Sequence, residues 1–308
     1  MLINDTKLFF CAIALFALVG CSREDSSSGT DATSNQQPPV STMATGDEVV
    51  TQSEELPSQS GSSEEQTGDM AEPSIYEAAL ADTRRPDNDV ERDTGRKPAE
   101  IMAYFGVTPG QRVVDMQSGP GYYTRIISEI VGPEGTVVAH NPGDFSRVND
   151  EFKAMLETQY AEYPNVELNY ELFEELSLPD NSVDAVFLSL IIHHWHYSED
   201  GGETIPAVSA KRYANIMRML KPGGIFGVID HLAAEGMSRK DSSAIHRIPV
   251  ETVISDVTSA GFILDGESDL LADHPEDDIT TYWRDKTPRG MTNRFVHLYR
   301  KPVEQTAP

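Results

Sequence analysis

The sequence predicts an α/β fold in which helices cover both faces of a mostly parallel sheet. The prediction starts at residues 112–124, where a run of apolar, partly β-branched residues ends in the turn Gly119-Pro-Gly121. Such a run before a glycine turn is typical of a buried parallel strand. Residues 122–131 then place four aliphatic side chains on one helical face, and Gly132 ends the helix. Strand, turn and helix form half of a βαβ unit, which aims backbone N–H groups at a ligand above the strand.

Strands and helices continue to alternate along the rest of the chain, as expected for such a sheet. Apolar runs bounded by turn residues indicate strands, and apolar residues spaced by three and four indicate helices. An antiparallel pair closes the sequence. The predicted elements are a helix near Pro98, strand 112–116, helix 122–131, strand 135–141, helix 151–160, strand 166–173, strand 184–192, helix 207–220, strand 225–229, helix 250–257 and the pair 262–264 and 294–299.

The chain is strongly acidic, with 24 Lys and Arg against 50 Asp and Glu among 308 residues, a net charge of −26. Phosphate binding needs a basic face, so we expect no nucleic-acid partner. Four arginines nevertheless cluster before the helix near Pro98. They are either a solvated face or the place where an anionic ligand enters. The arginines are Arg84, Arg85, Arg92 and Arg96.

Residues 8–20 are uncharged and almost entirely apolar. A stretch of about thirteen residues is too short to span a membrane and suits the core of a signal peptide. It ends in Leu18-Val-Gly-Cys21, which resembles the lipobox of bacterial lipoproteins. The resemblance implies that residues 1–20 are removed and that Cys21 is acylated. Ser22 is not acidic, which in that family implies the outer membrane, with the protein on its periplasmic side. An ordinary signal peptide is the alternative.

Residues 21–74 are rich in Ser, Thr, Gln and acid, with eleven acidic residues against one arginine over residues 22–74. Such a segment cannot bury enough apolar surface to order itself, so we expect a disordered tether followed by a domain at 75–308. Cys11 and Cys21 are the chain's only cysteines. Removal of the signal peptide and acylation of Cys21 would leave no disulfide and no thiol nucleophile.

The turn after the first strand resembles motif I of class I S-adenosylmethionine-dependent methyltransferases, whose usual form is Asp-x-Gly-x-Gly-x-Gly. Here Gln117 stands in the first glycine position. A dinucleotide fingerprint would need a third glycine where Thr124 stands, so NAD is disfavoured. The resemblance implies that Asp115, Gln117, Gly119 and Gly121 bind S-adenosylmethionine.

Two further positions depart from the family's usual pattern. Asn141 occupies the place of the acid that binds the ribose hydroxyls, and Leu172 that of the acid beside the adenine. Residues 178–184 and the turn Leu220-Lys-Pro-Gly-Gly224 follow the usual form more closely. The resemblance covers about residues 82–302 and is nearest to a group of predicted, often exported methyltransferases of unassigned substrate. It implies a Rossmann-like, seven-stranded sheet, mostly parallel, with a C-terminal antiparallel strand.

Polar side chains gather where the predicted strands end, which is where such sheets bind ligands. Methyl transfer to a protonated acceptor needs a base, and the histidine side chain titrates near neutral pH. We therefore expect His193 or His231 to be the base and Trp195 to pack on substrate or cofactor. Each histidine has a structural alternative. The other predicted site residues are Asn141 for the cofactor and His194, Asp230 and His246 for the pocket.

A metal site is not expected. His193 and His194 are neighbours at the end of a predicted strand, and adjacent strand residues point to opposite faces. The favoured function is an S-adenosylmethionine-dependent methyltransferase acting on a small molecule and held to the envelope by lipid alone. Export would separate it from a cytosolic cofactor. A non-catalytic binding module and, more weakly, a metal-assisted hydrolase are the alternatives.

Overall fold

The computed structural model describes residues 73–198, 204–285, 287–288 and 290–303. The predicted signal peptide, the lipidation site Cys21 and all but the last two residues of the predicted tether lie outside this part of the chain. Within the described residues, no helix has the length and apolar character needed to cross a membrane.

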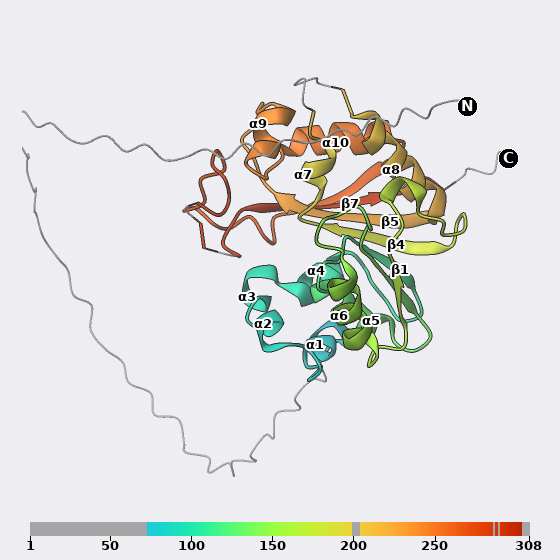
Figure 1. The fold of residues 1–308 in the computed structure, drawn as a ribbon. Coiled ribbons are helices and arrows are strands. Elements are labelled where there is room, and N and C mark those ends of the chain that lie inside the picture. Colours follow the sequence, from blue (N-terminus) through green and yellow to red (C-terminus); the bar gives the residue numbers. More distant parts are fainter. Residues whose placement is uncertain (1–72, 199–203, 286, 289, 304–308) are drawn as a thin grey trace, which may run out of the picture. The chain divides into compact units, whose positions relative to one another are not determined.

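Seven strands form a single sheet. They are β1 (Arg112–Met116), β2 (Thr136–His140), β3 (Val166–Asn169), β4 (Val183–Ser189), β5 (Leu220–His231), β6 (Ile263–Ser268) and β7 (Arg294–Arg300). Their order is β3-β2-β1-β4-β5-β7-β6, and β7 runs antiparallel to both of its neighbours (Figure 1). The other neighbouring pairs are parallel. The predicted seven-stranded, mostly parallel sheet with an antiparallel C-terminal strand is confirmed.

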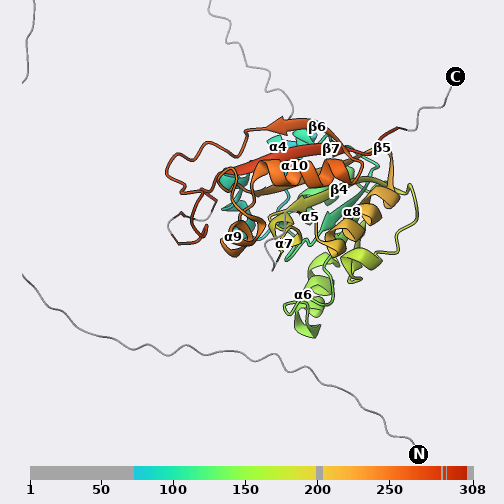
Figure 2. The same ribbon diagram turned by 90° about the horizontal axis from the view of Figure 1, so that it is seen from above.

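Helices cover both faces of this sheet. They are α1 (Ile75–Leu80), α2 (Asp87–Val90), α3 (Asp93–Arg96), α4 (Pro98–Tyr104), α5 (Tyr122–Val131), α6 (Asp150–Tyr160), η1 (Phe173–Glu175, a 3₁₀ turn), α7 (Ile192–Trp195), α8 (Ala207–Met219), α9 (Arg239–Ala244) and α10 (Val250–Ser259). Helices α1, α4, α5 and α6 lie on one face, and α8 and α10 lie on the other (Figures 1 and 2). The sequence predicts the longer helices, whereas it missed α1, α2, α3, α7 and α9.

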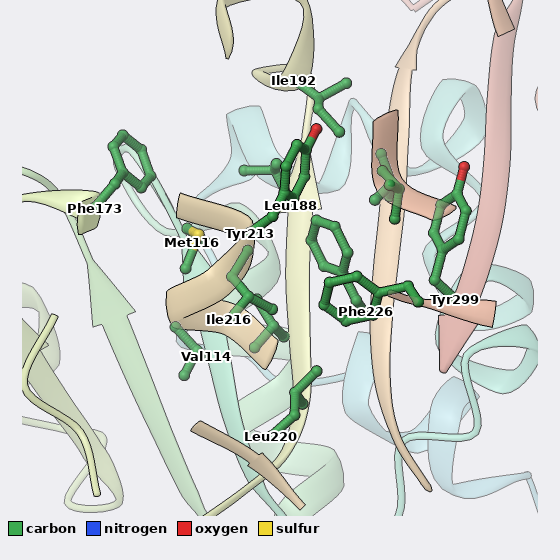
Figure 3. Packing of buried hydrophobic residues seen from close by; sticks show 14 of the residues in the cluster. Val114, Met116, Phe173, Leu188, Ile192, Tyr213, Ile216, Leu220, Phe226 and Tyr299 are labelled. Atoms are coloured by element: carbon green, nitrogen blue, oxygen red, sulfur yellow. The ribbon is translucent and has the colours of Figure 1, made fainter. Parts of the chain in front are cut away.

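Two apolar layers result from the alternation of side chains along the buried strands. Val113 faces the layer under α5, whereas Val114 and Met116 face the layer under α8 and α10. Figure 3 shows this second layer, where Tyr213 and Ile216 of α8 pack against the sheet. Side chains on both faces are almost fully removed from water, so the sheet holds its carboxyl edge rigidly.

Strand β4 is shorter than predicted, and this changes the site. The apolar run 184–192 was expected to be one strand, but β4 ends at Ser189. Leu190 has a left-handed backbone with φ of 62°, and α7 begins two residues later. His193 and His194 therefore lie on a short helix, and the prediction that they end a strand is wrong.

Two other boundaries also differ. The predicted strand 166–173 stops at Asn169, and Phe173 opens the 3₁₀ turn. The predicted turn at residues 221–224 lies inside β5, where the pairing with β4 jumps from Leu220 to Ile225. The glycines thus bulge out of a continuous strand and do not precede it.

Candidate functional site

The turn after β1 repeats one unusual backbone conformation at alternate positions. Gln117, Gly119 and Gly121 have φ values of 54°, 57° and 89°. These are the three glycine positions of the motif, and the left-handed region costs an L-residue about 1–2 kcal/mol. Gln117 therefore takes the left-handed backbone that glycine adopts most readily. Its Oε1 is buried and has no hydrogen-bond partner among the described residues.

The two glycines serve different purposes. A Cβ added at Gly121 would lie 1.7 Å from the hydroxyl oxygen of Tyr160, at the end of α6. A Cβ added at Gly119 would meet no atom of the described chain within 4 Å. Gly121 thus makes room for a side chain of the protein itself, whereas Gly119 faces open space. Of the two predicted cofactor glycines, only Gly119 leaves its backbone accessible to a ligand.

Asn141 follows β2 and holds the turn in place. Its Oδ1 accepts a hydrogen bond of 2.9 Å from the backbone N–H of Gly119, and its Nδ2 donates one of 2.8 Å to Oγ of Ser118. The side chain is 2% exposed. The structure brings Asn141 to the predicted place but commits its amide to the turn.

Asp115 is a buried carboxylate at the end of β1. Its Oδ2 accepts a hydrogen bond of 2.6 Å from the hydroxyl of Thr124 on α5. Burial raises the pKa of Asp115 to about 6, although the Thr124 bond and the charge of Arg96 work in the opposite direction. The carboxylate is mostly ionised at pH 7 in a place that penalises its charge.

A cavity of about 540 Å³ opens at the carboxyl edge of the sheet. Pro120 of the glycine turn, Leu190 after β4 and His231 at the end of β5 line it. A second hollow of about 390 Å³, beside Lys221, lies at the other end of the strands. Ligands of open α/β sheets bind at the carboxyl ends, so we take the first cavity as the site.

Four arginines line this cavity, two from the cluster noted in the sequence and two from the C-terminal region. They are Arg92, Arg96, Arg284 and Arg294. Arg92 pairs with Asp89. Counting the described residues, the other three have no carboxylate within ion-pair distance. The cavity is therefore a local basic site in an acidic protein, which favours an anionic group in its ligand.

The environments of these arginines differ. The Arg96 guanidinium lies 4.5 Å from the ring centre of Tyr122, and that of Arg284 lies 4.6 Å from the ring centre of Trp283. Arg294 is buried and donates hydrogen bonds to three backbone carbonyls, and burial lowers its pKa. The other two arginines of the predicted cluster have structural roles, since Arg84 pairs with Asp82 and Glu129 and Arg85 pairs with Asp93.

His231 is the predicted histidine that lines the cavity. Its ring stacks on Trp283 with centroids 4.9 Å apart, and its buried Nδ1 has no hydrogen-bond partner within the described chain. Burial lowers the pKa of His231 to about 3, against the opposing charge of Asp230. The imidazole is neutral at pH 7, so it acts as a hydrogen-bonding group until an anionic ligand raises that pKa.

His193 does not line the cavity and belongs to a separate cluster. Asp230 accepts hydrogen bonds from the backbone N–H of His193 at 3.0 Å and from its Nδ1 at 2.9 Å. The Nε2 of His193 lies 3.2 Å from Nδ1 of His246, and the His194 ring is 4.2 Å from the His193 ring. The structure thus brings four predicted site residues together, and none of the four is among the residues that line the cavity.

Trp195 corrects another expectation. It is 2% exposed and packs edge-on against Phe173 and Tyr213 in the apolar layer under α8. The prediction that Trp195 packs on a ligand is therefore wrong.

Sequence reasoning missed the cavity residues Trp283 and Arg284, for which neither spacing nor composition gave a signal.

Residues 114–228 match the protein family described as "Methyltransferase domain". The match begins in β1 and ends in β5, so it includes the glycine turn and Leu190 after β4. His231 and the four cavity arginines lie outside it. Residues 114–228 are therefore similar to a methyltransferase domain, and they make up just over a third of the chain. The match supports S-adenosylmethionine as the cofactor.

Similar proteins with known names are methyltransferases, at low identity. The sterol 24-C-methyltransferase of Yarrowia lipolytica is 27% identical over 206 residues, which cover 60% of this chain and 48% of that protein. The ubiquinone/menaquinone biosynthesis C-methyltransferase of Ectopseudomonas mendocina is 32% identical over 125 residues, which cover 41% and 43%. The alignments span less than half of each relative. A solved S-adenosylmethionine-dependent methyltransferase from Aquifex aeolicus has 17% identity and a TM-score of 0.46, covering 68% of this chain and 97% of that one.

The glycine turn and the adjoining cavity have features that fit this cofactor. Gly119 faces open space, and the buried Oε1 of Gln117 has no partner among the residues described. The arginines of the adjoining cavity suit the carboxylate that S-adenosylmethionine carries. The amide of Asn141 is bonded within the turn, and Gly121 lies close to Tyr160. The cofactor can therefore contact the turn only on the side of Gly119.

Proposed function

We propose that this protein transfers a methyl group from S-adenosylmethionine to a small molecule. The observation that carries the proposal is the open space before Gly119, beside a cavity large enough for a small ligand. Bound S-adenosylmethionine supplies an electrophilic methyl group. The residues that would hold it are Gln117 and Gly119 in the turn, with Asp115 buried behind them.

His231 is the proposed base or hydrogen-bonding partner for the acceptor. It lines the cavity, and its Nδ1 is buried and has no hydrogen-bond partner among the described residues. Arg96 and Arg284 would attract an acceptor with an acidic group. The negative charge of that acceptor would raise the pKa of His231 toward neutral pH, where a base is effective. A neutral acceptor would leave His231 a hydrogen-bond partner only.

The place of action is also a proposal. Cys21 follows an apolar stretch of signal-peptide length, so we infer that the protein is a lipoprotein on the periplasmic side of the outer membrane. The membrane contact would be the acyl chains alone. Activity there requires a supply of S-adenosylmethionine outside the cytosol.

Calorimetric titration of the purified full chain with S-adenosylmethionine tests cofactor binding. The test variant is Gly119→Ala, whose new methyl group points into the open space. Gly106→Ala is the matched control, because Gly106 also has a left-handed backbone, with φ of 64°, and open space around it. Both variants carry a similar backbone strain of about 1–2 kcal/mol. We expect at least a tenfold weaker affinity for Gly119→Ala and an unchanged affinity for the control.

Transfer is tested separately with methyl-labelled S-adenosylmethionine and the small-molecule fraction of a bacterial envelope extract. Label in a small molecule that needs the wild-type protein supports the enzyme. Cofactor binding without any transfer would favour a binding module, and the absence of binding at millimolar cofactor would overturn the proposal.

A further inference from the structure

We propose that His193, His194 and His246 bind a divalent transition-metal ion. One nitrogen of each ring can be chosen so that all three lie within 4.8 Å of one another. The rings come from two different elements, since His193 and His194 lie on α7 and His246 follows α9. This site lies outside the cavity lining and does not depend on the proposed methyl transfer.

The spacing of the nitrogens suits tetrahedral coordination. Zinc–imidazole bonds are about 2.0–2.1 Å long, so two such ligands at a tetrahedral angle have their nitrogens about 3.3 Å apart. The Nε2 of His193 and the Nδ1 of His246 are 3.2 Å apart. A hydrogen bond between two neutral imidazoles explains the same distance, but it does not explain why a third ring joins them. The His194 ring lies 4.2 Å from the His193 ring and 4.9 Å from the His246 ring, between centroids.

Asp230 orients the central ligand. Its carboxylate is fully buried and accepts a hydrogen bond from Nδ1 of His193. That bond places the proton on Nδ1 and leaves the lone pair of Nε2 directed toward His246. A carboxylate behind a histidine ligand fixes its tautomer in this way in many metal sites and increases the basicity of the ligand. The carboxylate also supplies negative charge close to the ion.

His246 occupies a strained backbone position. Its φ is 54°, in the left-handed region that costs a non-glycine residue about 1–2 kcal/mol. Such strain persists where the surrounding structure or a function requires it. The ring of this strained residue contacts the rings of His193 and His194, and its centroid lies 5.2 Å from that of Tyr282.

An ion can reach the site, because the His194 side chain is exposed while His193 is buried. Three imidazoles are typical ligands of Zn²⁺, Co²⁺, Ni²⁺ and Fe²⁺ rather than of Mg²⁺ or Ca²⁺. Three protein ligands leave a fourth position for water or for a ligand with a donor atom. The short helix α7 makes this possible, because neighbouring residues of a helix are not forced to opposite faces as those of a strand are.

Cobalt binding to the metal-stripped full chain tests the proposal. Tetrahedral Co²⁺ gives visible absorption bands, and competition with Zn²⁺ gives the affinity of the colourless ion. We expect one ion per chain. Asp230→Asn should weaken binding about 10- to 100-fold, the usual effect of removing a carboxylate behind a histidine ligand.

His194→Ala removes an exposed ligand with little effect on packing, and we expect it to abolish the cobalt bands. His246→Asn is a second test that keeps a residue tolerant of the left-handed backbone. His274→Ala is the matched control, since His274 lies outside the cluster. Absence of cobalt bands in the wild type at sub-millimolar protein and excess Co²⁺ would overturn the proposal. So would bands of wild-type intensity in either ligand variant.

Discussion

Replacement of Asp115 by Asn should stabilise the protein, and the gain should grow with pH. The pKa of Asp115 is raised from its ordinary value of 3.8 to about 6, and one pKa unit corresponds to 1.36 kcal/mol. The ionised carboxylate thus costs the folded state about 3 kcal/mol at pH 8. Because the folded-state pKa is the higher one, the cost is absent below pH 3.8, grows between the two values and is complete above pH 6. At pH 5 it is about half as large.

Urea unfolding of the wild type and Asp115→Asn at pH 5 and pH 8 measures this directly. Asn keeps an oxygen that can accept the hydrogen bond from Thr124, so the variant differs mainly in charge. The gain in unfolding free energy at pH 8 should be about twice that at pH 5. An equal change at both pH values, or a less stable variant at pH 8, would show that the carboxylate is not penalised by burial.

The same variant bears on the cofactor. A carboxylate that destabilises the fold is the kind of group that proteins retain at functional sites. S-adenosylmethionine is a sulfonium cation, whereas S-adenosylhomocysteine is an uncharged thioether at the same atom. Asp115→Asn should therefore weaken binding of the first more than of the second. Equal losses would assign Asp115 a role in shaping the turn alone.

Three further outcomes are expected. Asp277→Asn leaves the fully buried guanidinium of Arg247 without its carboxylate, so thermal unfolding should show a loss of about 3–5 kcal/mol; a change below 1 kcal/mol would contradict this. His231→Gln should lower kcat of the proposed transfer while the calorimetric affinity for S-adenosylmethionine stays within about twofold, and an unchanged kcat would exclude His231 as base. Cys21→Ser should move the protein from the membrane pellet to the soluble fraction, and continued membrane association would refute lipid anchoring there.

Local patterns predicted most of the sheet. The run before Gly119 and the aliphatic face of residues 122–131 are determined by neighbours in sequence, and β1 and α5 form as predicted. Gln117 illustrates the limit of such patterns. Its side chain counts against a glycine motif, yet its backbone takes the same left-handed form, because Asn141 and the flanking residues hold the turn. The residue type alone therefore does not predict the backbone conformation at this position.

The cavity could not be predicted because it joins segments that are remote in the sequence. Arg96 precedes the sheet, Arg284 lies in the loop before β7, and Arg294 begins that strand. The neighbours in sequence of each arginine give no sign of a binding site. The antiparallel pairing of β7 with β5 brings Arg294 opposite His231, which places a basic side chain at the strand end where ligands bind.

Neighbouring residues at the end of β5 serve two different sites. Ile229 faces the layer under α5 and Val228 the opposite layer, so alternation sends His231 and Asp230 to opposite sides of the sheet. His231 reaches the cavity, while Asp230 holds His193. The sequence places Asp230 and His231 in one predicted site, whereas the sheet directs His231 to the proposed acceptor cavity and Asp230 to the proposed metal site. Replacement of Asp230 should therefore weaken the affinity for the metal ion more than the affinity for S-adenosylmethionine. Replacement of His231 should weaken neither affinity.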